Sequence, residues 1–91
     1  MKSSPPDLTL ALLREDLPTL DLHGRSRWEA EYELFYFLKD HPGQLVHIIT
    51  GHGGGVVFEA TLNYLRALMR TQKVLNFEVS EQGGRLVALL A

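Results

Sequence analysis

Four short segments of the chain are predicted to be β-strands, either because apolar and polar residues alternate or, at residues 45–50, because a β-branched apolar run indicates a buried strand. Successive side chains of a strand point to opposite faces, so one face of each segment is expected to be buried. In the third segment we expect Leu75, Phe77 and Val79 to point inward. The four predicted strands cover residues 19–23, 45–50, 74–80 and 85–90.

Two longer segments carry apolar residues at the three- and four-residue spacing of a helix. The first helix is predicted from Arg27 to Lys39, and Ser26 with Glu29 forms a capping box at its start. Besides its apolar stripe, this helix carries an aromatic stripe made of Trp28, Tyr32, Phe35 and Tyr36.

The second helix is predicted from Val56 to Arg70. Its expected buried stripe consists of Phe58, Leu62, Leu65 and Met69. The element order is therefore βαβαββ. A helix between the first two strands implies a parallel, right-handed unit, whereas the turn at residues 81–84 implies an antiparallel hairpin. We expect an α/β two-layer sandwich (α+β), with two helices packed against a four-stranded mixed sheet.

Residues 1–19 precede the predicted domain, which covers residues 20–91. The segment begins with a Ser/Pro stretch, so we expect a partly mobile N-terminal extension. Asp7 is placed to cap a short helical turn. The leucines that follow are too apolar to stay in water, so they should dock on the domain or on a second copy. Self-association thus has two candidate surfaces, the extension and the aromatic stripe.

Composition narrows the class of protein. A length of 91 residues with 45% hydrophobic content suits one small folded domain. The absence of cysteine excludes disulfides, thiolate metal sites and a cysteine nucleophile. A net charge of -2 argues against a broad basic surface, so nucleic-acid binding would need a local positive patch, to which Arg25 could contribute. No signal peptide or membrane-spanning run is visible, which favours the cytoplasm and no membrane partner.

Residues 20–24, Leu-Asp-Leu-His-Gly, are the most informative part of the chain. In an extended strand the two leucines face the core, whereas Asp21 and His23 share the solvated face. A carboxylate beside an imidazole is suited to orienting the ring and moving a proton. The structural alternatives are that Asp21 only ties down the loop and that His23 is only a hydrogen-bond donor.

A second candidate feature is the glycine-rich segment after the second strand. Thr50-Gly51-His52-Gly53 runs into the second helix, and a strand, glycine loop and helix in this order can present N–H groups to a phosphate. Parallel strands end at one edge of a sheet, so the loop should lie near Asp21 and His23. Thr50 could add a hydrogen bond, and His52 adds positive charge only when it is protonated. The alternative is a flexible turn.

The two motifs, LDLHG at residues 20–24 and the TGxG-type sequence at residues 50–53, resemble those of the Smr (small MutS-related) domain family. The resemblance implies a nucleic-acid endonuclease domain that nicks DNA or cleaves RNA. It points to Asp21 and His23 as catalytic residues. It points to Thr50, Gly51 and Gly53 as residues that bind nucleic acid, with His52 at a position where many relatives are expected to carry a basic residue.

Several alternatives stay open at this point. The chain could be a non-catalytic nucleic-acid-binding module, or a protein-interaction module whose glycine loop binds no phosphate. If the reaction uses Mg²⁺ or Mn²⁺, Asp21 is the candidate ligand. Only His23 and His52 share an edge, so zinc is not expected, and His47 in mid-strand should be structural. The sequence does not decide between DNA and RNA, between a whole protein and a piece of a larger MutS-like protein, or between oligomeric states.

Overall fold

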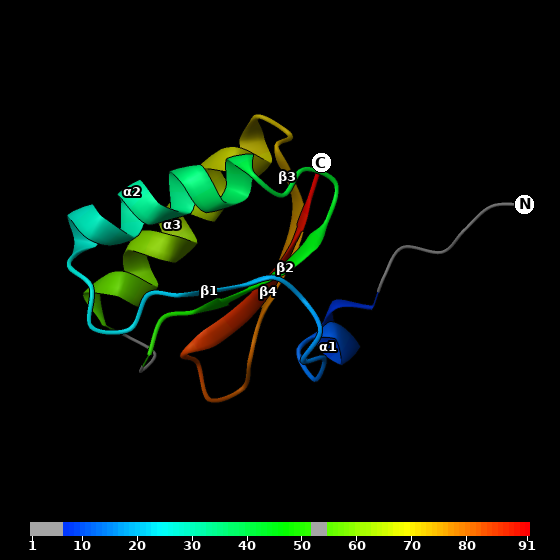
Figure 1. Ribbon diagram of the computed structural model, residues 1–91, viewed down its shortest axis with the longest axis horizontal. Coiled ribbons are helices and arrows are strands. Elements are labelled where there is room, and N and C mark those ends of the chain that lie inside the picture. The colour runs from blue at the N-terminus through cyan, green and yellow to red at the C-terminus, as the bar shows by residue number, and fades with distance from the viewer. Residues whose placement is uncertain (1–6, 52–54) are drawn as a thin grey trace, which may run out of the picture.

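The computed structural model describes residues 7–51 and 55–91 of the protein. Its four strands form one sheet in the order β1-β2-β4-β3, with α2 and α3 on one face and the short α1 on the other (Figure 1). The predicted mixed sheet with two packed helices is confirmed, and a third helix is added to it. The elements are α1 (Leu8–Ala11), β1 (Thr19–Asp21), α2 (Arg27–Lys39), β2 (Leu45–Ile49), α3 (Val56–Arg70), β3 (Val74–Val79) and β4 (Arg85–Leu90).

The pairing of the strands places the carboxyl ends of β1 and β2 at the same edge. β1 runs parallel to β2, with Asp21 opposite Ile49. β4 is antiparallel to both of its neighbours, β2 and β3, so the last strand of the chain lies inside the sheet. The parallel pair and the hairpin follow the prediction, and the segments after Asp21 and after Ile49 leave the sheet side by side.

Both long helices begin and end where the sequence predicts. At the start of α2, the Ser26 hydroxyl accepts a hydrogen bond from the Glu29 N–H at 3.1 Å, and the Glu29 carboxylate accepts one from the Ser26 N–H at 2.9 Å. These two bonds form the predicted capping box, which satisfies N–H groups that a helix leaves unpaired. The cap fixes where α2 starts relative to the end of β1.

The main core lies between the sheet and the two long helices. Leu22, Leu34, Ile48, Leu65 and Leu86 have no exposed surface there. The inner face of α3 also includes Val57, Ala60 and Thr61, whereas Phe58 is half-buried and Met69 is exposed, against prediction. The reason is that α3 packs on α2 as well as on the sheet, which turns its buried face toward residues 57 and 61.

Strand ends and one strand face also differ from prediction. β1 ends two residues early, at Asp21, and β2 and β3 each end one residue early. Leu75 was expected to point inward, but it is 53% exposed. The cause is a β-bulge: Val74 pairs with Leu90 and Asn76 with Leu89, so Leu75 has no partner and turns outward.

The N-terminal segment docks on the domain itself. The Asp7 carboxylate caps α1 by accepting hydrogen bonds from the N–H groups of Thr9 and Leu10, as predicted. Leu8 and Ala11 are buried against Val87 on the sheet face opposite α2 and α3. Residues 1–6, for which partial mobility is predicted, lie outside the described residues. Among the helices that the structure describes, none is long and apolar enough to cross a membrane.

Candidate active site at the carboxyl edge of the sheet

Asp21 and His23 meet directly at the end of β1. The strand stops at Asp21, and the Leu22 N–H donates to the Ile49 carbonyl at 2.6 Å while the Leu22 side chain is fully buried. The chain then turns at Gly24, which has a φ of +77°. This turn replaces the predicted extended geometry and places His23 Nδ1 2.6 Å from Asp21 Oδ1.

Asp21 both orients the imidazole and ties down the turn. Its Oδ1 accepts a second hydrogen bond from the His23 N–H at 3.1 Å. The hydrogen bond from the His23 side chain, followed by the backbone bond, holds the pKa of Asp21 below its usual value. An ionised carboxylate can only accept, so Nδ1 donates to Asp21, and in a neutral imidazole Nε2 then has the free lone pair. The His23 side chain is 71% exposed, so Nε2 is open to a substrate.

Gly51 of the TGxG-type motif lies close to His23 of the LDLHG motif. Its φ is +89°, and a Cβ atom at this position would lie 3.4 Å from the Cβ of His23. The N–H groups of Thr50 and Gly51 both donate to the Gly84 carbonyl, at 2.8 and 3.2 Å. The Gly51 N–H is thus engaged by the β3–β4 turn, whereas residues 52–54 of the glycine segment lie outside the described residues. Gly51 instead serves close packing beneath His23.

Thr50 lies next to Gly51 at the end of β2, and its hydroxyl makes no hydrogen bond to the described residues. Its side chain is buried, and Oγ1 has no hydrogen-bond partner among the described residues. A buried hydroxyl without a partner costs free energy, so a ligand or water that supplied one would be favoured. The structure places Thr50 where prediction put it, at the end of β2 and next to Gly51.

The start of α3 adds backbone N–H groups to this edge of the sheet. Gly55 is the N-cap of α3 and offers no side-chain cap, and the first N–H groups of a helix have no partner inside it. Together with the positive end of the helix dipole, such groups favour an anion. A cavity of about 540 Å³ opens here. It is lined by His23, Gly24, Arg25, Ile49, Thr50, Gly51, Gly55, Val56, Val57 and Phe58.

The positive patch is smaller than the sequence suggests. Arg25 lines the cavity, but its Nε donates to Glu33 Oε2 at 2.7 Å. Arg27 lies 3.5 Å from Glu31 in the same way. Sequence analysis missed Glu33 because it follows Arg25 by eight residues, across the start of α2. Arg25 keeps its terminal NH₂ groups for a ligand, with its charge partly neutralised.

The remaining predicted residues are separated from this site or lie outside the described residues. His52 and Gly53 belong to the latter group. His47 is buried on the α1 side of β2, as a structural histidine. Within residues 7–51 and 55–91, no three His, Asp or Glu side chains gather where they could hold a metal ion. Asp21 offers a single carboxylate, one of whose oxygens His23 already engages.

Comparison with known proteins agrees with the arrangement of the two motifs. A family model described as the Smr domain matches residues 20–89, which include both the Asp21–His23 turn and Gly51. A search of curated proteins finds no match. Among solved structures, the chain is similar to the Smr domain of MutS2 from Thermus thermophilus, with a TM-score of 0.68 and 25% identity over 82% of this chain and 99% of that one. The chain belongs to the Smr domain family.

Proposed function

We propose that this protein is a nucleic-acid endonuclease domain that hydrolyses phosphodiester bonds. The observation that carries the proposal is the exposed Asp21–His23 pair, held at 2.6 Å beside a cavity that the start of α3 lines. The MutS2 domain named above and the family match support a nucleic-acid substrate.

In this proposal His23 acts as the general base. Nε2 takes a proton from the water that attacks phosphorus, and the P–O bond to the leaving group breaks. The imidazolium is stabilised by ionised Asp21 and returns the proton to the leaving oxygen. A well-placed acid–base group of this kind contributes on the order of 10²- to 10⁴-fold to a rate.

We assign phosphate binding to groups that lie around the Asp21–His23 pair. The unpaired N–H groups at the start of α3 and the Thr50 hydroxyl would stabilise the charge that develops on the phosphate. The terminal groups of Arg25 add a positive charge at the rim. Contributions from His52 and Gly53 remain part of the proposal, and they come from outside the described residues.

The described residues do not by themselves form a site for Mg²⁺ or Mn²⁺, since Asp21 is the one carboxylate of the pair. Mg²⁺ commonly binds one or two carboxylates together with substrate phosphates. A metal ion would therefore bind to Asp21 and to the substrate together. The proton transfer by His23 does not require a metal ion.

The test uses the whole chain on supercoiled plasmid and on structured RNA, each with Mg²⁺, with Mn²⁺ and with a chelator. We expect nicking or cleavage of at least one substrate. Asp21→Asn should lower the rate by about 10²-fold, because asparagine accepts the same hydrogen bonds without the negative charge that stabilises an imidazolium. No cleavage of either substrate by the wild type under any of the three conditions would contradict the proposal.

A non-catalytic nucleic-acid-binding module is the second candidate. One observation favours it: among the described residues that line the cavity, His23 and Arg25 are the two ionisable ones, so none of them is a carboxylic acid that could protonate the leaving group. Binding of either substrate with no cleavage, and with equal affinity for wild type and Asp21→Asn, would support this candidate over the enzyme.

A further inference from the structure

The outer face of α2 carries a row of exposed aromatic side chains, which we call the outer stripe: Trp28, Tyr32, Phe35 and Tyr36. These residues are 48 to 71% exposed. Trp28, Tyr32 and Phe35 follow the i, i+4, i+7 spacing of a helix-pairing seam. Ala30 and Leu34, on the opposite side of the helix, have no exposed surface. α2 is thus apolar on two opposite sides, and the protein covers one of them.

The aromatic rings of the outer stripe pack against one another within a single copy of the chain. The rings of Trp28 and Tyr32 are stacked at 6.0 Å, and those of Tyr32 and Tyr36 meet edge-on at 5.1 Å. Phe35 and Tyr36 also meet edge-on, at 5.0 Å. Because neighbouring rings already hold one another, docking a partner on them costs little side-chain entropy.

The charges beside the stripe favour a protein over a nucleic acid. Arg25 and Arg27, at the start of the helix, are paired with Glu33 and Glu31. A polyanion gains affinity from unpaired cations along its track. At the N-terminal end of the stripe the flank carries Glu31 and Glu33, which partly neutralise both arginines, and positive charge is found at the other end, at Lys39 beside Phe35.

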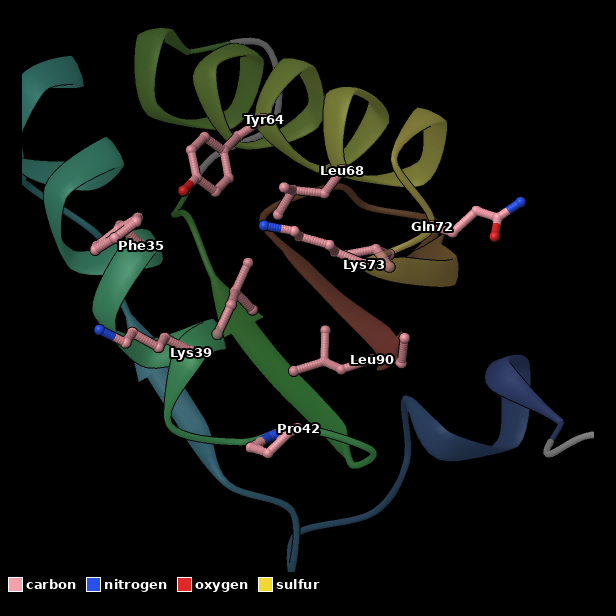
Figure 2. Close-up of a pocket in the computed structure, with 11 residues that line it drawn as sticks. Phe35, Lys39, Pro42, Tyr64, Leu68, Gln72, Lys73 and Leu90 are labelled. Carbon is pink, nitrogen blue, oxygen red and sulfur yellow. The ribbon is translucent and has the colours of Figure 1, made fainter.

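A cavity of about 450 Å³ lies at the other end of the same helix (Figure 2). Its walls combine the apolar side chains of Phe35, Leu38 and Leu68 with two lysines, Lys39 and Lys73. No acidic residue is among those that line it. The Lys39 ammonium already lies 5.8 Å from the centre of the Phe35 ring. An apolar cavity with cations at its rim suits an aromatic ring, which attracts a cation to its face.

We propose that the outer stripe is the interface between two copies of this chain. With the two α2 helices antiparallel and centred between Glu33 and Leu34, Trp28 of one copy lies opposite Lys39 of the second copy. Tyr32 then lies opposite Phe35. Each copy presents a protruding indole and receives one beside its cavity. The interface therefore uses the same patch on both copies, as a twofold dimer requires.

The available area fits a second copy. Taking roughly 200 Å² for a whole aromatic side chain, the stripe exposes about 450 Å² per copy. With the rims of both cavities, a pair of copies buries about 1,000 Å², the lower end of specific interfaces. The competing surface, the N-terminal segment, has already placed Leu8 and Ala11 against its own sheet. An interface of this size is typical of weak or transient association, so we expect a weak dimer.

The experiment is sedimentation equilibrium of the whole chain from about 1 to 500 µM, without nucleic acid. Trp28 is the single tryptophan, so its fluorescence reports on the stripe. We expect a monomer–dimer transition, and a blue shift of the emission with the same midpoint. Tyr32→Glu should raise the dissociation constant at least about tenfold, because a carboxylate would face Phe35 of the second copy.

The matched control is Leu13→Glu, which places the same charge on an apolar side chain that is 78% exposed in the N-terminal segment. It should leave the dimer unchanged. Trp28→Ala provides a second disruption, and circular dichroism checks the fold of each variant. A monomer at every concentration overturns the proposal, as does a dimer that Leu13→Glu breaks and Tyr32→Glu does not. A monomer whose Trp28 emission is quenched by oligothymidylate would assign the stripe to single-stranded nucleic acid instead.

Discussion

His23 owes its position to Gly51 as much as to Asp21. Asp21 fixes the imidazole through two hydrogen bonds, and Gly51 packs beneath it from the neighbouring strand. His23 is therefore held by one hydrogen-bonded partner within its own motif and by one close approach from the second motif. Each can be altered separately.

Gly51→Ala should impair cleavage more than it impairs folding. Alanine at a φ of +89° is strained, and relief of that strain would move backbone whose added Cβ lies 3.4 Å from the His23 Cβ. Gly43→Ala is the control, because Gly43 also has a positive φ, of +72°, but no atom within 4 Å of an added Cβ. Both variants should lose about 1–2 kcal/mol of unfolding free energy. Only Gly51→Ala should lower the cleavage rate per folded molecule, and equal rates would remove the Gly51 contact from the account.

Some contacts of single residues in the candidate site cannot be predicted from the sequence. The Asp21–His23 pair is visible in the sequence because its two members are two residues apart. The bond from the Gly51 N–H to Gly84, and the pairing of Arg25 with Glu33, are not visible. Gly84 reaches Gly51 through the pairing of the strands, and Glu33 reaches Arg25 from within α2. The sequence therefore names the candidate residues, and the structure adds the partners that some of their polar groups already have.

Among the elements, the two long helices and β4 were predicted to the residue, whereas β1, β2 and β3 end earlier than predicted. The start of α2 is determined by a local signal, Ser26 with Glu29, and Pro42 follows its end. A strand ends where its partner stops pairing, which depends on another part of the chain. Leu75 illustrates the point, since the bulge that turns it outward is a property of the β3–β4 pairing. The strand order β1-β2-β4-β3 likewise depends on pairing between distant parts of the chain, so local sequence signals do not determine it.

Ser26→Ala should test how strongly the capping box holds α2 against the site. Loss of an N-cap hydroxyl costs about 0.5–2 kcal/mol. Urea denaturation should show that loss with an unchanged denaturant slope, since the folded state stays equally compact. Ser80→Ala is a suitable comparison, because the Ser80 hydroxyl donates to Gly83 in a turn and caps no helix. An unchanged midpoint for Ser26→Ala would show that the cap contributes nothing to stability.

At the scale of the whole molecule, the docked N-terminal segment covers a histidine. His47 lies in mid-β2 on the face that α1 covers, 5% exposed, and its Nε2 has no partner among the described residues. Burial, and then the charge of Arg85, lower the pKa of His47 below its ordinary value of 6.5, while the backbone of Leu12 acts in the opposite direction. The folded protein thus favours neutral His47.

Stability should therefore fall on acidification. The unfolded chain takes up a proton at His47 near pH 6.5, whereas the folded chain resists it, so the free energy of unfolding decreases as pH drops below about 6.5. Thermal denaturation between pH 7.5 and 5 should show this decrease. His47→Val should reduce it, because valine can pack beside Val87 without a titrating group. His41→Asn is the control, since His41 bonds to the Phe37 carbonyl away from α1. An undiminished pH dependence in His47→Val would assign the effect to another group.

Chemical rescue shows whether His23 moves a proton during cleavage. The measurement is the cleavage rate of His23→Ala with and without added imidazole, on whichever substrate the wild type cuts. The site is open, because the side chain that is removed is 71% exposed. The account predicts a loss of about 10²-fold or more, with the fold intact, and a rise of at least about tenfold with imidazole. Full activity in folded His23→Ala, or a loss that imidazole does not relieve, would contradict it.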